Sequence, residues 1–199
     1  MKISKRKLWI GVISSLLFII LKLLDGLSDY HVAADKTYDT AKQLIFTIAH
    51  FYLYISILFL LKNVLIDFYH QEFLRKNLSW IIRLTAITAA LSILIVLGFG
   101  EYLAIIGLIL AFIELFFYLR FFGDVMSIDV HSFPIISQLK WFVKALLISL
   151  LFLVLISVVM KYGGMPEAKY LNQIFLAIPF IFMSMFFYKT IKYLEKPLK

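Results

Sequence analysis

Long apolar stretches alternate with short polar segments along the whole chain. Each stretch has about 20 residues, the length of helix that crosses the hydrocarbon core of a bilayer. The stretches lie at residues 8–24, 44–61, 80–99, 102–119, 141–160 and 171–188. The pattern therefore predicts an all-α, polytopic integral membrane protein with six transmembrane helices.

Aromatic and basic residues mark the ends of these stretches. Each tryptophan stands at the start of an apolar stretch with basic residues close by, at Trp9, Trp80 and Trp141. The other stretches end beside a basic residue, at Lys62, Arg120 and Lys189. Indole rings and long cationic side chains favour the membrane–water interface, so these residues support the predicted spans.

Basic residues are distributed unequally between the two sides of the predicted bundle. The N-terminal segment, the connections 62–79 and 120–140, and the C-terminal tail carry most of them. The connections on the opposite side carry only Lys36, Lys42, Lys161 and Lys169. The positive-inside rule then places both termini in the cytoplasm, and the spans form three hairpins with an N-in/C-in orientation.

The N-terminal segment resembles a signal peptide because basic residues precede an apolar stretch. No small-x-small cleavage site follows that stretch, where the sequence continues as Lys22-Leu23-Leu24-Asp25-Gly26. We therefore expect a retained first span. The compact length and the absence of organelle signals favour a prokaryotic plasma membrane.

Composition narrows the class of protein further. The 199 residues are 63% hydrophobic with a mean hydropathy of +0.95, and the short connections leave no room for a soluble domain. We expect one transmembrane domain over residues 1–199, with the lipid bilayer as its surroundings. The chain has no cysteine, which excludes disulfides, thiolate nucleophiles and cysteine metal sites. Its net charge of +8 is dispersed at the ends of the spans, so we expect no nucleic-acid partner.

The connections and the last span carry further signals. Residues 25–43 form an acidic outer loop. Residues 62–79 place apolar side chains at helical spacing, which predicts that helix continues from the second span into this connection and lies along the cytoplasmic membrane surface. Pro179 stands near the middle of the last span, where its ring removes a backbone donor and predicts a kink.

Small residues in the third and fourth spans indicate close helix packing. Ala86 and Ala90 form one small-xxx-small pair, and Gly107 and Ala111 form another. Such pairs let helix backbones approach in lipid. Packing within the short hairpin is the simpler interpretation, and self-association is the alternative.

Glu114 is the candidate functional carboxyl. It lies within the fourth span, about 9 Å along the helix from Arg120. A carboxyl at that depth must be protonated, paired or facing water. Arg83 and Lys144 each begin a span on the cytoplasmic side and are the candidate partners. A structural ion pair or a neutral acid is the simpler interpretation, and a proton or ion pathway is the alternative.

Histidine and acidic residues offer weaker candidates. His50 lies within the second span, where a neutral, hydrogen-bonded imidazole is expected and a titrating group is the alternative. The outer loop carries carboxylates and one imidazole at spacings that allow a divalent cation, at Asp25, Asp29, His31, Asp35 and Asp39. We prefer a solvated acidic loop, because nothing in the sequence fixes a coordination shell.

Motifs of known membrane and hydrolytic enzymes are missing. The sequence has no His-Glu-x-x-His, no Gly-x-Ser-x-Gly and no glycine-rich phosphate loop, and no motif identifies a cofactor. We therefore expect a small non-catalytic multi-pass membrane protein that acts through helix or loop contacts with a membrane-protein partner, as an accessory subunit, a regulator or an immunity-type factor. The alternative is a small transporter or channel, proton-coupled through Glu114. A third interpretation is a membrane enzyme that acts on lipid through the acidic outer loop.

Overall fold

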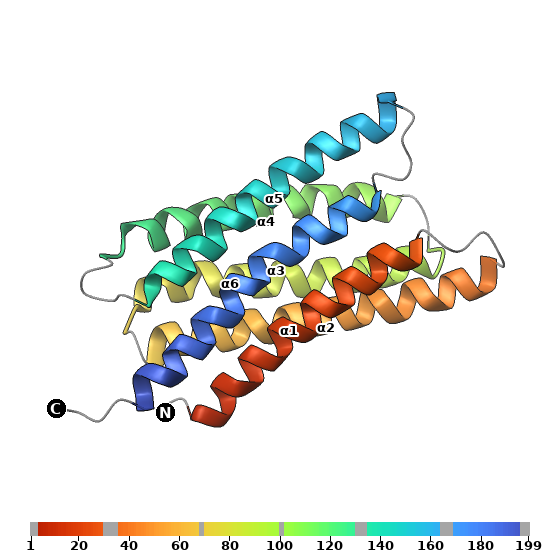
Figure 1. Ribbon diagram of the computed structural model, residues 1–199. Coiled ribbons are helices and arrows are strands. Elements are labelled where there is room, and N and C mark those ends of the chain that lie inside the picture. Colours follow the sequence, from red (N-terminus) through yellow and green to blue (C-terminus); the bar gives the residue numbers. More distant parts are fainter. Residues whose placement is uncertain are drawn as a thin grey trace. The chain divides into compact units, whose positions relative to one another are not determined.

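A computed structural model of the chain describes residues 4–29, 36–67, 70–99, 102–129, 135–163 and 169–195. Over these ranges the regular secondary structure is entirely helical (Figure 1). The helices are α1 (Lys5–Asp29), α2 (Lys36–Asp67), α3 (Glu72–Val96), α4 (Tyr102–Ser127), α5 (Ile136–Gly163) and α6 (Lys169–Glu195). The predicted all-α class is confirmed.

Five of these helices are long and apolar enough to cross a bilayer. Their candidate spans are Lys5–Asp25, Thr40–Asp67, Glu72–Val96, Ile105–Ser127 and Gln173–Glu195. A helix of 25 residues, such as α3, is about 37 Å long, which exceeds the roughly 30 Å hydrocarbon core. The span predicted at residues 141–160, within α5, stays a prediction.

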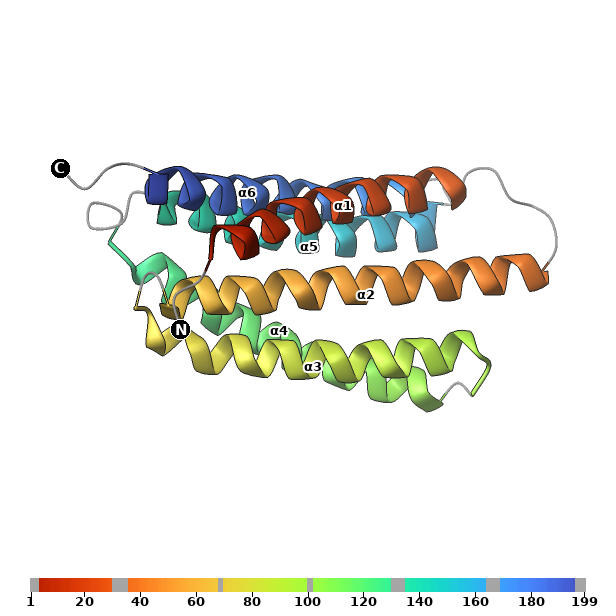
Figure 2. The same ribbon diagram turned by 90° about the horizontal axis from the view of Figure 1, so that it is seen from below.

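The helices form two compact units (Figure 2). In one unit α3 packs against both α2 and α4, and in the other α6 packs against both α1 and α5. The predicted hairpins α3–α4 and α5–α6 are therefore packed pairs. Helices α1 and α2 of the first predicted hairpin belong to different units, so this hairpin stays a prediction.

The segment 62–79 is helical over most of its described residues, and its position relative to a membrane surface stays a prediction. Its described residues belong to the last turns of α2 or the first turns of α3, except His70 and Gln71 in the turn between them. His70 adopts a positive φ of 53°, and the Gln71 N–H donates to the Leu65 carbonyl over 2.8 Å. Leu65 is fully buried, so its side chain packs within the unit.

A glycine ends α3 and aligns it with α4. Gly98 has a φ of +86°, its N–H donates to Ile95 O, and the N–H of Phe99 donates to Leu94 O, both over 3.0 Å. These paired bonds form a Schellman motif, in which glycine takes the left-handed position at least cost. The predicted short connection between the third and fourth spans is confirmed.

Helices also extend into the segment 25–43 that the sequence assigned to an outer loop. Helix α1 continues to Asp29, and α2 already begins at Lys36. The connecting residues His31 and Asp35 lie outside the described residues. The side chains of Asp29 and Asp39 also lie outside them, although their backbones are helical.

The unit of α2, α3 and α4 is packed most tightly near the α2–α3 turn. Fully buried side chains from α2 and α3 gather there, including Ile57, Leu61, Leu74 and Leu78. Helix α4 adds its C-terminal half through Phe121 and Val125. Toward the other end of the unit, polar side chains enter the helix contacts, as described below.

The unit of α1, α5 and α6 relies on close backbone approach between α1 and α6. A Cβ atom at Gly11 would lie 2.9 Å from ring atoms of Phe187 on α6. Ser15, one turn along α1, is fully buried and returns its hydroxyl to the Gly11 carbonyl over 2.8 Å. Gly11 and Ser15 thus form a small-xxx-small pair that the sequence analysis missed.

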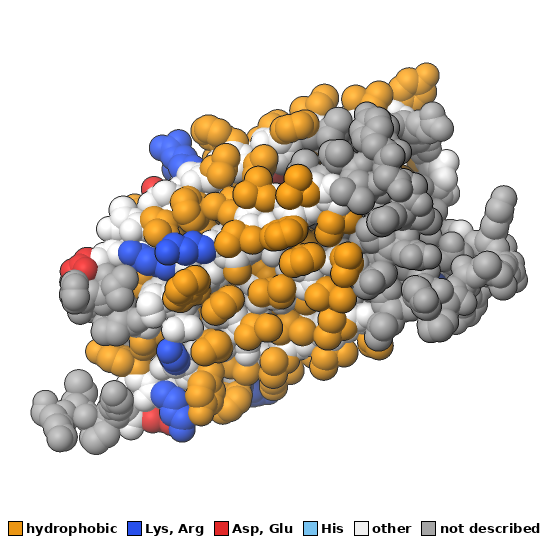
Figure 3. All heavy atoms as spheres, turned by 45° about the horizontal axis from the view of Figure 1, so that its top comes forward, with side chains coloured by type: hydrophobic (Ala, Val, Ile, Leu, Met, Phe, Trp, Pro, Cys, Tyr) orange, Lys and Arg blue, Asp and Glu red, His pale blue; other side chains and the backbone are white. Residues whose placement is uncertain are grey.

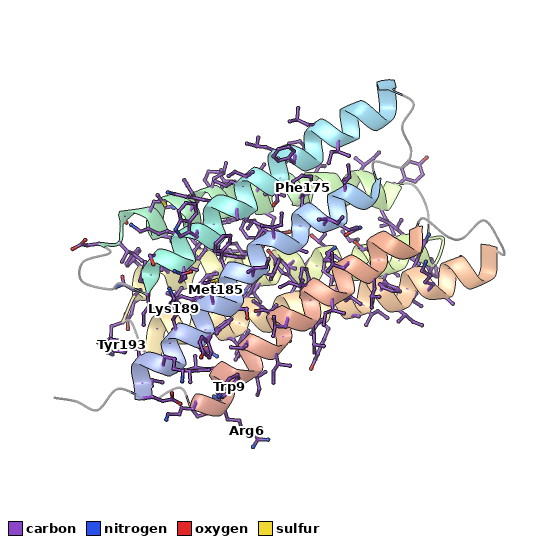
Figure 4. The ribbon with its side chains drawn as sticks, in the orientation of Figure 1. Arg6, Trp9, Phe175, Met185, Lys189 and Tyr193 are labelled. Carbon is purple, nitrogen blue, oxygen red and sulfur yellow. The ribbon has the colours of Figure 1, made fainter. Side chains whose placement is uncertain are left out.

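Helix α6 continues through Pro179, and the kink there stays a prediction. Proline lacks the N–H that would bond to the carbonyl of Phe175, one turn earlier. The Ser149 hydroxyl of α5 donates to that Phe175 carbonyl over 2.6 Å. Phe175 lies on α6 where this helix faces α5, and its ring stacks on Phe152 of α5 at 4.6 Å (Figure 4). A neighbouring helix therefore supplies the donor that proline removes.

Apolar side chains cover most of the described surface seen in Figure 3. Large residues such as Ile105, Phe112 and Leu151 are at least 60% exposed. A water-soluble protein of this size rarely exposes so many large apolar side chains. The surface is suited to lipid or to other apolar helices.

Candidate functional site

Four polar side chains meet among α2, α3 and α4. The Thr85 hydroxyl on α3 donates to Glu114 Oε1 on α4 over 2.6 Å. Tyr118 lies one turn further along α4, on the same face of that helix as Glu114. The hydroxyl of Tyr54 on α2 shares a hydrogen bond with that of Tyr118. We call Tyr54, Thr85, Glu114 and Tyr118 the carboxyl cluster.

Local helix geometry positions each member of the cluster. Glu114 and Tyr118 are four residues apart, so both side chains extend from one face of α4. Thr85 is only 2% exposed and lies on the α3 face that also buries Leu78 and Ile81. A threonine hydroxyl within a helix often bonds to its own backbone one turn earlier, but Thr85 instead reaches across to α4.

The predicted basic partners of Glu114 make other contacts. Arg83 is exposed, and its guanidinium lies 5.4 Å from the centre of the Trp80 ring. Lys144 belongs to the other unit, where its ammonium lies 5.1 Å from the centre of the Trp141 ring. Within its own unit Glu114 therefore accepts from the Thr85 hydroxyl in place of Arg83, and its pairing with Lys144 stays a prediction.

His50 and Thr88 lie next to the carboxyl cluster. His50 is one turn from Tyr54 on α2, and Thr88 is about one turn from Thr85 on α3. The His50 ring packs edge to face on Phe46 with ring centres 6.4 Å apart, and its Nε2 atom is buried. Thr88 Oγ1 is buried without a hydrogen-bond partner among the described residues. Buried polar groups thus continue beyond the cluster along α2 and α3.

Another polar contact joins α3 and α4 near the α2–α3 turn. The Asn77 amide donates to Asp124 Oδ2 over 2.5 Å, and Asn77 is only 6% exposed. The sequence analysis did not identify this pair, nor the pair of Tyr54 and Tyr118 next to Glu114. The four-residue spacing of Glu114 and Tyr118 was the available signal, but tyrosines in spans are more readily read as interfacial anchors.

The small residues predicted to pack α3 against α4 lie elsewhere. Ala86, Ala90 and Ala111 are exposed, and a Cβ atom at Gly107 would meet nothing within 4 Å. The preferred interpretation, close packing within this hairpin through these residues, is therefore wrong. Aromatic rings contribute to the helix contact instead, with Trp80 of α3 stacked on Phe117 of α4 at 5.8 Å.

The outer acidic residues make no metal site among the residues that the structure describes. Of the five candidates, only Asp25 has a described side chain, and it lies one turn from Lys22 on α1. The Lys22 ammonium donates to Gln173 Oε1 on α6 over 3.0 Å and lies 5.6 Å from the centre of the Phe18 ring. Lys22 is therefore a cation held within a helix contact, which the sequence analysis did not single out.

The carboxyl cluster combines one carboxyl with three hydroxyls from three helices, and together these groups can donate and accept hydrogen bonds. No protein-family model, curated protein or solved structure matches this chain. The function must therefore be inferred from the geometry of the chain's own residues.

Proposed function

We propose that this chain is a small, non-catalytic multi-pass membrane protein that acts through contacts of its helices with partner membrane proteins. The observation that carries the proposal is the use of polar groups. Three hydrogen bonds each join two helices that belong to the same unit. They pair Thr85 with Glu114, Ser149 with the Phe175 carbonyl, and Lys22 with Gln173. The outward surface is left predominantly apolar, which suits partner helices in a bilayer.

The proposed setting is a prokaryotic plasma membrane that the chain crosses six times, with both termini in the cytoplasm. Two contacts support termini on one side. Lys5 Nζ at the start of α1 lies 3.8 Å from Glu195 Oε1 at the end of α6, and the Trp9 ring packs on Tyr188 at 6.2 Å. Arg6, Trp9, Lys189 and Tyr193 gather near the same ends of α1 and α6, which suits a cytoplasmic interface (Figure 4).

Proton-coupled transport through Glu114 is the second candidate function. The observation that favours it is the carboxyl cluster itself, in which Thr85 of α3 donates to Glu114 of α4 and Tyr118 of α4 pairs with Tyr54 of α2. Buried Thr88 and His50 extend the polar groups beyond the cluster. No comparable observation supports the lipid enzyme, because most of its candidate residues have no described side chain.

The test combines site-specific photo-crosslinking in cells with a flux assay. A photoreactive residue at exposed Phe112 is expected to capture a membrane protein, whereas the same residue at buried Val125 serves as the matched control. Crosslinks to lipid alone from Phe112 and from other exposed positions, Ile105 and Leu151, would contradict the first proposal. Proton flux into liposomes that contain the purified chain, abolished by Glu114→Gln, would favour transport instead.

A further inference from the structure

The Trp80 side chain on α3 contacts both an aromatic ring and a cation. It stacks on Phe117 of α4 with ring centres 5.8 Å apart, and the Arg83 guanidinium lies 5.4 Å from the centre of the indole. Trp80 is still 41% exposed, so part of its ring faces the surroundings. We propose that these side chains, together with Lys76 of α3 and Arg120 of α4, bind the headgroup of an anionic phospholipid. The five residues are called the headgroup site below.

This ligand differs from the partner proteins of the proposed function. The inference rests only on the proposed membrane setting, in which phospholipid surrounds the chain. It holds whether or not the chain also contacts partner proteins or moves protons, because the headgroup site shares no residue with the carboxyl cluster.

Helical spacing places the α3 members of the headgroup site on one face. Lys76 precedes Trp80 by four residues and Arg83 follows it by three, so each basic side chain lies one turn from the indole. Both basic side chains are exposed. The cations therefore lie next to the exposed part of the ring rather than within the helix contact.

Helix α4 adds Arg120 at the same level. Arg120 lies between Phe117, which contacts Trp80, and Asp124, which accepts a hydrogen bond from Asn77 over 2.5 Å. It therefore lies beside the stretch of α3 from residue 77 to residue 80. Arg120 is exposed and three residues from Phe117, so the two share a face of α4. Basic side chains of two helices thus flank one stacked aromatic pair.

The positive charges of the headgroup site are not balanced by acids of the protein. None of its three basic side chains forms an ion pair with an acidic residue in the described part of the chain. Asp124 already accepts the Asn77 amide, and Glu72 lies one turn before Lys76 at the start of α3. The site therefore keeps a net positive charge, to which a phosphate group is complementary.

The donors of the headgroup site suit a phosphate at the membrane surface. Arginine presents its N–H donors in one plane, and their spacing matches the oxygens of a phosphate. Basic pockets between helices on the cytoplasmic side of a membrane bind anionic headgroups, and indole rings favour the same depth. The chemistry and the proposed depth therefore agree.

Apolar surface beyond the headgroup site distinguishes a lipid from a free phosphate ion. Ile87 lies seven residues after Trp80 on α3, and Ile113 lies four residues before Phe117 on α4, so each extends the same face into the candidate span. The two isoleucines are 49% and 42% exposed. Acyl chains attached to a bound phosphate can lie along them, whereas inorganic phosphate gains no such contact.

The unit of α1, α5 and α6 repeats this arrangement. Trp141 of α5 stacks on Phe182 of α6 with ring centres 6.1 Å apart, and the Lys144 ammonium lies 5.1 Å from the centre of the indole. Trp141 is exposed, and so is Lys189, seven residues after Phe182 on α6. Two helix pairs with different sequences thus combine an exposed indole, a phenyl ring and basic side chains, which supports a ligand common to both.

Fluorescence quenching at Trp80 tests the inference. The full chain with Trp9→Phe and Trp141→Phe keeps Trp80 as its single tryptophan. It is reconstituted in vesicles of phosphatidylglycerol and phosphatidylcholine, of which one carries brominated acyl chains. Brominated phosphatidylglycerol should quench Trp80 more strongly than brominated phosphatidylcholine at the same mole fraction. Arg83→Gln should lower the affinity ratio of the two lipids by about fivefold, the effect of one basic residue near an anionic membrane surface.

Arg75→Gln is the matched control. Arg75 is exposed on the same helix but five residues from Trp80, which places it on another face. Its replacement removes the same charge and should leave the affinity ratio unchanged. Native mass spectrometry of the chain with all its tryptophans keeps the test valid if the single-tryptophan chain does not fold. There Arg83→Gln should retain fewer phosphatidylglycerol molecules than Arg75→Gln.

Three outcomes would overturn the inference. Equal quenching by the two lipids would show no preference for an anionic headgroup at Trp80. Equal losses from Arg83→Gln and Arg75→Gln would show that the net charge of the chain, rather than the headgroup site, attracts the lipid. Inorganic phosphate that abolishes the preference, where sodium chloride of the same ionic strength does not, would identify a free anion as the ligand. None of these outcomes depends on the crosslinking experiment, so the two proposals fail separately.

Discussion

Two glycines that look alike in the sequence have different surroundings in the structure. Gly11 and Gly107 both lie inside long apolar helices, and a side chain at either position would be sterically tolerated by the helix itself. At Gly11 the Phe187 ring of α6 occupies the space that a Cβ atom would need. At Gly107 that space is open. Only Gly11 is therefore required for close helix packing.

Replacement of each glycine by alanine should separate packing from helix propensity. Gly11→Ala forces the buried Phe187 ring to move, and we expect a loss of about 1–3 kcal/mol in unfolding free energy. Gly107→Ala is the matched control, for which we expect a neutral effect or a gain of roughly 0.5–1 kcal/mol from helix propensity. Unfolding of the purified chain in mild detergent measures both. Equal effects of the two substitutions would refute the proposed role of Gly11.

Single residues were predicted unevenly from the sequence. Glu114 was identified because a carboxyl within an apolar span is conspicuous, and the tryptophan–cation pairs were visible because each pair is local. Trp80 with Arg83 and Trp141 with Lys144 are indeed in contact. Thr85 was not predicted as the donor to Glu114, because the donor–acceptor pair joins residues 29 positions apart. Such pairing depends on helix rotation, which local spacing does not determine.

At the scale of helices, a side chain of α5 provides a hydrogen bond that α6 lacks because of its proline. Pro179 leaves the Phe175 carbonyl without its intrahelical donor, and Ser149 of α5 supplies one. In hydrocarbon an unsatisfied carbonyl is costly, so proline within a span depends on such a donor. The hydrogen bond therefore contributes to the pairing of α5 with α6 as well as to the integrity of α6.

A double-mutant cycle should reveal this dependence. Ser149→Ala alone should lower the unfolding free energy by about 0.5–1.5 kcal/mol, because the Phe175 carbonyl loses its donor. In a Pro179→Ala background the restored backbone N–H bonds to that carbonyl, and the cost of Ser149→Ala should approach zero. Unfolding in mild detergent gives the four free energies. Additive effects would show that Ser149 does not compensate for the proline.

Helices were predicted more reliably than their ends and partners. Apolar length alone identified the six helices, and Gly98 marked the α3–α4 turn. The predicted C-terminal ends of the first two helices came too early along the chain, because each helix continues through polar residues beyond its apolar part, to Asp29 and Asp67. The packing partner of α1 was missed because Gly11 and Phe187 are 176 positions apart, and nothing local in the sequence joins them.

At the scale of the whole molecule, the chain combines a contiguous unit with one assembled from both ends of the sequence. Helices α2, α3 and α4 follow one another, whereas α1 joins α5 and α6. The prediction of three hairpins assumed that each helix packs on its sequence neighbour. Within the units, α3 packs on α4 and α5 packs on α6, and α1 also packs closely on α6.

Single introduced cysteines should test the proposed orientation, because the natural chain has no cysteine. Ser4→Cys and Lys192→Cys should react with a membrane-impermeant maleimide only after the cytoplasmic face is opened to the reagent. Thr40→Cys, exposed at the start of the α2 span, is the opposite control and should react in intact cells. Labelling of Ser4→Cys in intact cells would contradict a cytoplasmic N-terminus.

The pairing of α1 with α6 also sets an order of events during biosynthesis. Helix α1 leaves the ribosome first, yet the surface it packs against is translated last. The unit of α2, α3 and α4 has no such delay, since its helices emerge in succession. If the chain inserts into a membrane as proposed, Gly11 and Lys22 stay without their α6 contacts until α6 has been made. The earliest part of the nascent protein is thus among the last to reach its native contacts.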